Sequence, residues 1–224
     1  TQKQASLCYK KLNMSKKNTS VILKNSFLEF RDLSHIFISF KKKIDKLKKN
    51  SYAVAVSGGP DSLALAALSK AYSYHKKTNF KYVLVNHNIR KNSLAEARKV
   101  KKILYKLKIN LVIISNTEKI DKNIQSNARK IRYKILSDFC IKNKIKYLLT
   151  AHNLEDQVET FFIRLSRGSG LKGLSSMREL SKLNNSLKLF RPLLDIKKRQ
   201  LIKISKIVFG SYVKDPSNVN KKFL

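Results

Sequence analysis

The hydrophobic residues of this chain form short continuous runs that alternate with longer segments of helical spacing. The run Tyr52–Val56 is apolar throughout and leads into two glycines, which is typical of a buried strand. The segment Asp61–His75 that follows is rich in leucine and alanine and free of β-branched residues, which favours a helix. This stretch therefore predicts a strand, a tight loop and a helix.

The same alternation continues toward the end of the chain. Strands are predicted at Lys81–Asn86, Leu111–Ser115 and Tyr147–Ala151, and helices at Ser93–Leu107, at Gln125–Lys142, from near Leu154 onward and at Lys197–Val208. Strands and helices that alternate with connections of this length are typical of an α/β fold with a doubly wound parallel sheet. Ligands of such sheets bind beyond the carboxyl ends of the strands.

Two segments precede the first strand. In Phe27–Lys49 the apolar residues recur at steps of three and four, which predicts an amphipathic helix, either continuous or broken near His35. Residues 1–26 are polar, aperiodic and free of acidic side chains, and we interpret them as an N-terminal extension without an assigned structure.

The loop after the first strand has the composition of a phosphate-binding site. Glycines in SGGPDS, residues 57–62, let the backbone approach an anion because glycine lacks Cβ and tolerates positive φ. Asp61 and Ser62 lie in the first helical turn, where side-chain oxygens cap free amides and the helix dipole attracts phosphate. The simpler alternative is an ordinary Gly-Pro turn. The GxxxxGK[ST] loop of the common NTPases does not occur in the sequence.

Polar clusters follow three of the predicted strands, at Ser57–Ser62, Asn86–Arg90 and His152–Glu159. Parallel strands end at one edge of the sheet, so we expect these clusters to lie together. In the last cluster, Asp156 and Glu159 share one face of the predicted helix and His152 precedes its first turn. Carboxylates and an imidazole there could bind Mg²⁺ or orient a nucleophile. The alternative is acidic residues that simply complement the helix dipole.

The charge of the chain indicates a polyanionic partner, for which nucleic acid is the first candidate. The formal net charge is +35, although the charge is spread along the chain and a compositional bias toward lysine explains part of it. In such a lysine-rich chain, the few arginines mark positions where a planar guanidinium is harder to replace. Five of them fall within the motifs described here: Arg90, Arg129, Arg132, Arg164 and Arg167.

Several classes of protein are disfavoured by the sequence. Cys8 and Cys140 form no CxxC pair, so neither a disulfide framework nor a zinc site is indicated. No apolar run approaches the roughly 18 residues of a membrane span, and the N-terminus lacks the apolar region of a signal peptide. We therefore expect a cytoplasmic protein without a membrane partner.

The stretch Thr150–Leu174, TAHNLEDQVETFFIRLSRGSGLKGL, resembles the signature TAHHxDDQxETxLxRLxRGSGxxGL of the tRNA(Ile)-lysidine synthetases. These enzymes belong to the ATP-pyrophosphatase, or PP-loop, superfamily, whose loop SGGxDS is similar to SGGPDS. The tags NHNIR, NARKIRY, RPLLDI and DPSN also resemble family motifs and occur in the family's order. Six tags in sequence are far more specific than any one of them.

The resemblance implies a fold of the adenine nucleotide alpha hydrolase type, with helices on both faces of the sheet. It also implies a ligase that uses ATP and Mg²⁺ and whose partners are free L-lysine and an isoleucine tRNA with a CAU anticodon. In the first step, the C2 oxygen of the first anticodon cytidine is adenylated and pyrophosphate leaves. In the second step, the lysine amine displaces AMP, giving lysidine and AUA decoding.

Roles carried over from the family fall on three groups of residues. ATP binding is assigned to Ser57, Gly58, Gly59, Pro60, Asp61 and Ser62, with Asp61 also near the metal, and to His87 and Arg90. Catalytic or substrate-orienting roles are assigned to Asp61, Arg132, His152 and Asp156, with Glu159 second in line. RNA binding is assigned to Arg129, Arg164, Arg167 and Lys172.

Three positions depart from the family pattern: Glu155 replaces an aspartate, Asn153 a histidine and Gln125 a glutamate. We therefore place the essential carboxylate at Asp156 and expect no role for Glu155 that depends on its reach. The family pattern continues past DPSN, so we expect residues 27–224 to be a catalytic domain without further C-terminal domains, either a fragment or a reduced enzyme. The alternatives are a cytidine thiolase, an amidating NAD or GMP synthetase, and a non-catalytic RNA-binding relative.

Overall fold

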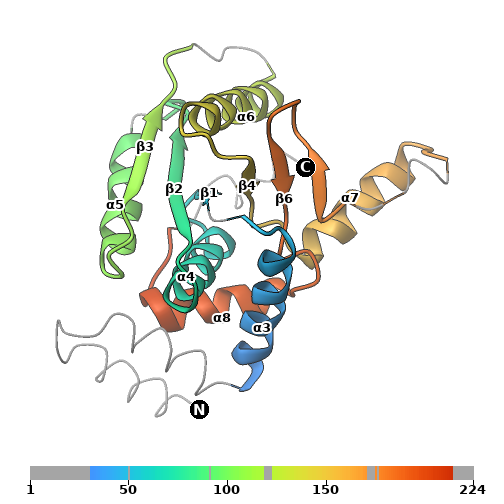
Figure 1. Cartoon of the computed structure of the whole chain (residues 1–224). Coiled ribbons are helices and arrows are strands. Elements are labelled where there is room, and N and C mark those ends of the chain that lie inside the picture. The colour runs from blue at the N-terminus through green and yellow to red at the C-terminus, as the bar shows by residue number, and fades with distance from the viewer. Residues whose placement is uncertain are drawn as a thin grey trace.

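The computed structural model describes residues 31–49, 51–90, 92–118, 123–170, 175 and 177–213. Its centre is a six-stranded sheet with the strand order β3-β2-β1-β4-β6-β5 (Figure 1). The strands are β1 (Ser51–Ala55), β2 (Asn79–Asn86), β3 (Leu111–Ser115), β4 (Tyr147–Leu149), β5 (Leu180–Lys182) and β6 (Lys188–Phe190). The DPSN tag and the N-terminal extension lie outside the described residues.

Helices cover both faces of this sheet, as expected from the family resemblance. They are α3 (Arg31–Lys46), α4 (Pro60–His75), α5 (Ser93–Tyr105), α6 (Ile124–Lys142), α7 (Leu154–Ser166) and α8 (Lys198–Phe209). Buried residues of α3, α4, α5 and α8 share one hydrophobic cluster with the sheet, whereas those of α6 belong to a second cluster with β1, β2, β4 and β6. Helix α3 continues through His35, so the alternative of a broken helix is wrong.

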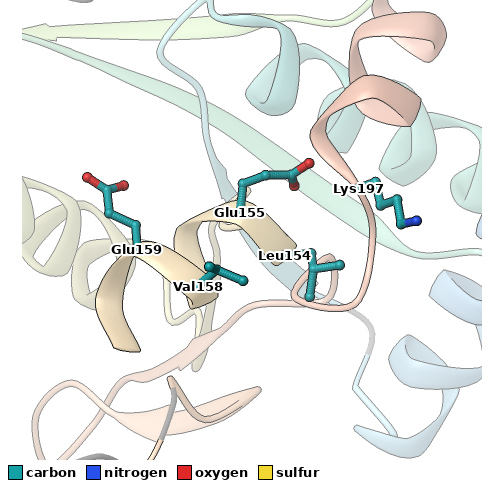
Figure 2. Close-up of a pocket in the computed structure, with 5 residues that line it drawn as sticks. All are labelled: Leu154, Glu155, Val158, Glu159 and Lys197. Atoms are coloured by element: carbon teal, nitrogen blue, oxygen red, sulfur yellow. The ribbon is translucent and has the colours of Figure 1, made fainter. Parts of the chain in front are cut away.

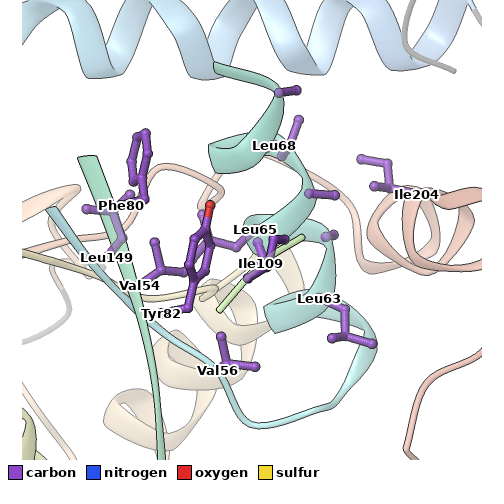
Figure 3. Packing of buried hydrophobic residues seen from close by; sticks show 14 of the residues in the cluster. Val54, Val56, Leu63, Leu65, Leu68, Phe80, Tyr82, Ile109, Leu149 and Ile204 are labelled. Atoms are coloured by element: carbon purple, nitrogen blue, oxygen red, sulfur yellow. The ribbon is translucent and has the colours of Figure 1, made fainter. Parts of the chain in front are cut away.

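The main core lies around α4, which is covered by the sheet on one side and by α3 and α8 on the other (Figure 3). Leu63, Leu65 and Leu68 of α4 are fully buried, and Val54 and Leu149 meet them from the sheet. Because α4 is buried nearly all round, its sequence lacks a polar face. A helix of this kind is typical of the centre of an α/β core.

The predicted parallel sheet is confirmed for β1, β2, β3, β4 and β6, but β5 pairs antiparallel with β6. Neither β5 nor β6 was predicted from the sequence. Each has three residues and includes lysine at an exposed position, so neither shows a hydrophobic period. The antiparallel strand lies at the edge of the sheet, a common addition to a parallel α/β sheet.

Strands β1, β2, β4 and β6 run parallel, so their carboxyl ends meet at one edge of the sheet. The segments that follow them are therefore neighbours, as the sequence analysis expected. Helix α7 begins at this edge and projects away from the sheet (Figure 1), and none of its residues is buried in the described part of the chain. No helix among the described residues is long and apolar enough to cross a membrane.

Candidate active site

The loop between β1 and α4 is held closed by the hydroxyl of Ser62. Its Oγ accepts hydrogen bonds from the backbone N–H groups of Ser57 and Gly58, at 3.1 Å each, and donates to the carbonyl of Gly59 at 3.0 Å. Gly58 has a φ of +92°, and a Cβ there would lie 2.4 Å from Cγ2 of Val100. Only glycine fits this position without strain.

Capping of α4 differs from the sequence prediction. Asp61 and Ser62 were expected to cap the helix, but Gly59 occupies the N-cap position and no side chain caps the first amides. Pro60 is the first helical residue and has no N–H. The positive end of the α4 dipole therefore lacks an anionic cap, which is the arrangement that favours a bound phosphate.

Asp61 is held beside this loop with an unsatisfied carboxylate. Its Oδ1 is buried and has no hydrogen-bond partner among the described residues. Burial raises the pKa of Asp61 to about 6, and the nearby carboxylates of Asp156 and Glu155 act in the same direction, against Lys198 and the amide of Asn153. The side-chain amide of Asn153 lies beside this carboxylate and favours its ionised form. A buried carboxylate oxygen without a partner is suited to bind a cation.

Asn153 and Asp156 form a capping box at the start of α7. Asn153 Oδ1 accepts from the backbone N–H of Asp156 at 3.0 Å, and Asp156 Oδ2 accepts from the backbone N–H of Asn153 at 2.9 Å. The fully buried Asn153, which departs from the family motif, therefore has a structural role. Asp156 has one as well, while its charge still acts on both Asp61 and His152.

Glu155 and Glu159 line one cavity beside α7. Glu155 Oε2 accepts a hydrogen bond from the backbone N–H of Lys198 at 2.8 Å, so Glu155 caps α8. Figure 2 shows both carboxylates on an open cavity of about 360 Å³ that Leu154, Val158 and Lys197 complete. The longer side chain at position 155 thus joins α7 to α8.

His87 and Arg132 meet across the sheet edge. Nε of Arg132 donates to Nε2 of His87 at 3.1 Å. Burial and the charge of Arg132 lower the pKa of His87 to about 4, so this imidazole is neutral near neutral pH. Because Nε2 is an acceptor, the proton of the neutral ring is on Nδ1, which is buried without a partner among the described residues.

His152 is also neutral. Burial lowers its pKa to about 4, and the charges of Arg191, Arg129 and Arg132 lower it further, whereas Asp156 opposes them. Nδ1 of His152 lies 3.0 Å from the hydroxyl oxygen of Thr150. The structure therefore brings Arg132 of α6 to His152 and Asp156.

Arg191 is the site residue that the sequence analysis missed. It follows β6 directly, and its Nη1 donates to the carbonyl of Arg178 and to Oγ of Ser181, at 2.9 Å each. The tag RPLLDI contained it, and arginine is scarce in this lysine-rich chain, so the signal was present. Its position at the site could not be predicted, because it depends on β6, which pairs with β4 and was not predicted from the sequence.

The other predicted residues are more scattered. Nη2 of Arg90 lies 3.8 Å from Oε2 of Glu96, and the guanidinium of Arg129 lies 5.2 Å from the ring centre of Tyr133. Arg164 and Arg167 are at the far end of α7, where Nη1 of Arg164 donates to the carbonyl of Ser175. Lys172 lies outside the described residues.

Comparisons with known proteins agree with the motifs. The profile of the family described as "PP-loop domain" matches residues 33–224. The tRNA(Ile)-lysidine synthase of Wolbachia pipientis wMel is 43% identical over 177 residues, which is 78% of this chain and 41% of that protein. The enzyme of the same name from Bradyrhizobium diazoefficiens is 34% identical over 202 residues, covering 89% of this chain and 54% of the relative. The chain thus spans about half the length, or less, of these curated relatives.

A solved structure shares the fold. The U34-tRNA thiolase NcsA from Methanococcus maripaludis, solved with its [4Fe-4S] cluster, superposes with a TM-score of 0.69 at 24% identity, covering 82% of this chain and 66% of that chain. In the described part of the present chain the free cysteine is Cys140, which is buried, and burial raises the pKa of its thiol to about 12. That thiol is not suited to bind a cluster or to act as a nucleophile.

Proposed function

The chain belongs to the PP-loop domain family, and we propose that it carries the ATP-dependent active site of a tRNA(Ile)-lysidine synthetase. The enzyme would ligate free L-lysine to C2 of the first anticodon cytidine of an isoleucine tRNA with a CAU anticodon. One observation carries this proposal. A phosphate-type loop, an unsatisfied carboxylate at Asp61 and the His87–Arg132 pair meet at one edge of the sheet.

In the first step, the C2 oxygen of the cytidine attacks the α-phosphorus of ATP, and the bond from that phosphorus to the departing pyrophosphate breaks. No protein nucleophile is needed, so the task of the enzyme is to hold the phosphates and to stabilise charge. The loop at Gly58 and the open end of α4 are suited to bind the pyrophosphate. Arg132, oriented by His87, is suited to stabilise charge on the α-phosphate.

The residues present fit Mg²⁺ bound together with ATP. Among the described residues no group of three or more His, Cys, Asp or Glu could hold a metal alone. Mg²⁺ usually takes only one or two carboxylates, together with water and substrate phosphates. Asp61 would supply one such carboxylate, and the metal would neutralise charge on the pyrophosphate.

In the second step, the amine of lysine attacks C2, the bond from C2 to the AMP-bearing oxygen breaks, and AMP leaves with the bonding electrons. The attacking amine must be neutral and must lose a proton. Asp156 and the neutral imidazole of His152 are the proton acceptors nearest this chemistry. Glu159 is exposed on the next turn of α7 and is a weaker candidate.

The RNA would be held mainly through its phosphates, for which the net charge of +35 is suited. Arg129, which acts on His152, would contact phosphates beside the target cytidine, whereas Arg164 and Arg167 at the end of α7 would contact a second region of the RNA. A thiolase is the less favoured alternative because the buried thiol of Cys140 is unsuited to sulfur transfer.

Pyrophosphate release tests the proposal against a non-catalytic RNA-binding relative. With ATP and isoleucine tRNA present, adding lysine should convert a single turnover into continued release, since only lysine clears the adenylated RNA. Asp61→Asn should abolish release, whereas Asp138→Asn, an exposed aspartate of α6, should not. If release is absent from the unaltered protein, or is independent of the RNA, the proposal is wrong.

A further inference from the structure

The guanidinium of Arg191 has one edge occupied and one edge available. The two hydrogens of Nη1 are used by the carbonyl of Arg178 and by Oγ of Ser181. Nε is buried and has no hydrogen-bond partner among the described residues. The edge formed by Nε and Nη2 is the one that binds a carboxylate or a phosphate with two parallel hydrogen bonds.

The β5–β6 hairpin fixes this orientation. Ser181 lies on β5 opposite Leu189, and the backbone N–H of Arg191 donates to the carbonyl of Glu179 at 2.8 Å. Three contacts from the antiparallel edge strand and the residues before it therefore hold one arginine. The short strand β5 and the residue Arg178 before it therefore orient the guanidinium of Arg191, because they provide both hydrogen-bond acceptors of its Nη1.

The surroundings of Arg191 carry an excess of positive charge. Burial lowers its pKa and Arg129 acts in the same direction, and only Tyr133 opposes them. Arg129, Arg132 and Arg191 all act on His152, which places three guanidinium groups around one imidazole. Arg191 is half-buried whereas Arg129 and Arg132 are exposed, and a partly desolvated guanidinium with further positive charge nearby favours the binding of an anion.

We propose that Arg191 binds a phosphate oxyanion of the substrate through its Nε–Nη2 edge, in a subsite completed by Arg129 and His152. The subsite rests on the proposed function for the identity of its ligand. Two sources offer the same chemistry: the phosphate that becomes AMP, and a phosphodiester of the RNA beside the target cytidine. The pairing of β6 with the end of β4 places Arg191 near the proposed reacting centre. Arg191 directly follows Phe190, whose carbonyl accepts from the backbone N–H of Thr150, and the hydroxyl of Thr150 contacts His152.

The test compares Arg191→Lys with Arg178→Lys. Arg178 is an exposed arginine on the approach to the same hairpin, so its replacement controls for a general loss of guanidinium. Binding of AMP, and separately of an anticodon stem-loop RNA, is measured by calorimetry at one fixed salt concentration. Arg191→Lys keeps the positive charge but loses the two parallel N–H donors of the guanidinium. We expect the affinity for one of these two ligands to fall at least about tenfold. Loss of AMP binding alone would identify the nucleotide phosphate as the ligand of Arg191, and loss of RNA binding alone would identify a phosphate of the RNA.

A second variant, Ser181→Ala, tests the same subsite if Arg191→Lys does not fold. Ser181→Ala keeps Arg191 but removes one of its supports, and should weaken the same ligand about threefold, with an unchanged circular dichroism spectrum. The inference is overturned if the folded variants bind both ligands as tightly as Arg178→Lys does, or if the unaltered protein binds neither. A protein that binds through Arg191 but forms no lysidine would contradict the proposed function and leave the phosphate subsite standing.

Discussion

Nε of Arg132 donates a hydrogen bond to Nε2 of His87 across 3.1 Å, which joins α6 to the end of β2. Two motifs that are 45 residues apart in the chain therefore act as one unit. The bond exists only while His87 is neutral, because a protonated imidazole has no acceptor nitrogen. The orientation of Arg132 thus depends on the low pKa of its partner.

This dependence predicts how stability responds to pH. His87 has a folded pKa of about 4, below the unfolded value of about 6.5, so the unfolded chain binds the proton first as pH falls. The contribution of neutral His87 to the free energy of unfolding is complete above about pH 6.5 and is lost as the pH falls to about 4. In His87→Gln the melting temperature should fall less steeply over this window, whereas His35→Gln, which replaces an exposed histidine of α3, should behave like the unaltered protein. Equal slopes for both variants would contradict the assignment.

Asp61→Asn should separate stability from function. The carboxylate is partly buried and unsatisfied, and burial raises its pKa to about 6, so its charge is held at a cost near neutral pH. Asparagine has nearly the same volume without the charge. We expect the melting temperature of the ligand-free protein to rise by about 2–4 °C, which corresponds to about 1 kcal/mol in a domain of this size. Exchange of pyrophosphate into ATP should fall by at least about a hundredfold.

A melting temperature that drops in Asp61→Asn would show that the carboxylate serves packing. Exchange that survives in a folded variant would remove Asp61 from the ATP site.

The glycines of the loop provide a matched pair. Gly58→Ala places a Cβ 2.4 Å from Cγ2 of Val100 at a φ of +92°, so it should cost about 2–5 kcal/mol in the free energy of unfolding. Gly59→Ala meets only Oγ of Ser57, at 3.7 Å, and should cost less than about 1 kcal/mol. Urea unfolding of both variants is the measurement. Similar losses for the two would mean that the loop adopts another conformation.

Asp156→Asn tests whether the carboxylate of Asp156 takes part in the reaction or only in the capping box of α7. Asparagine at position 156 keeps an oxygen that can accept the hydrogen bond from the backbone N–H of Asn153, so the stability of Asp156→Asn should change little, whereas loss of the N-cap in Asn153→Ala should cost about 0.5–2 kcal/mol. The control is Asn153→Ala, which breaks the same capping box and keeps the carboxylate. Per folded molecule, we expect turnover to fall at least about a hundredfold in Asp156→Asn and much less in Asn153→Ala. Equal turnover in the two variants would reduce Asp156 to a capping residue.

The RNA path along α7 is tested by salt dependence. Arg167→Ala should reduce the slope of log affinity against log salt by about one unit, since one phosphate contact is lost. Arg199→Ala removes an exposed arginine of α8 and should leave the slope unchanged. A slope that Arg167→Ala does not alter would exclude this residue from the RNA interface.

The sequence predicted the parts of the fold that carry a strong hydrophobic signal. Four strands and the helices between them followed from apolar runs such as Tyr52–Val56, which the sheet buries. Strands β5 and β6 carried no such signal, because their pairing depends on the rest of the sheet and not on their own three residues. Without β6 the position of Arg191 could not be foreseen.

Motif spacing predicted which segments meet at the carboxyl edge of the sheet, but not the hydrogen bonds among them. Ser62 was expected to cap α4 and instead closes the loop, which depends on the backbone conformation at Gly58. Asn153 replaces a histidine of the family pattern, and in the structure it is the N-cap of α7 that accepts from the backbone N–H of Asp156. Such roles depend on which amides each side chain can reach, and the order of residues does not contain that information.

The most direct test of the central proposal is to incubate this chain with ATP, Mg²⁺, lysine and an isoleucine tRNA bearing CAU, and to determine the mass of the nucleosides after digestion. We predict that one cytidine per tRNA gains the mass of a lysine less one water, and only when ATP and lysine are both present. A folded chain that binds ATP and the RNA but leaves this cytidine unchanged, or that replaces its C2 oxygen with sulfur, would contradict the account.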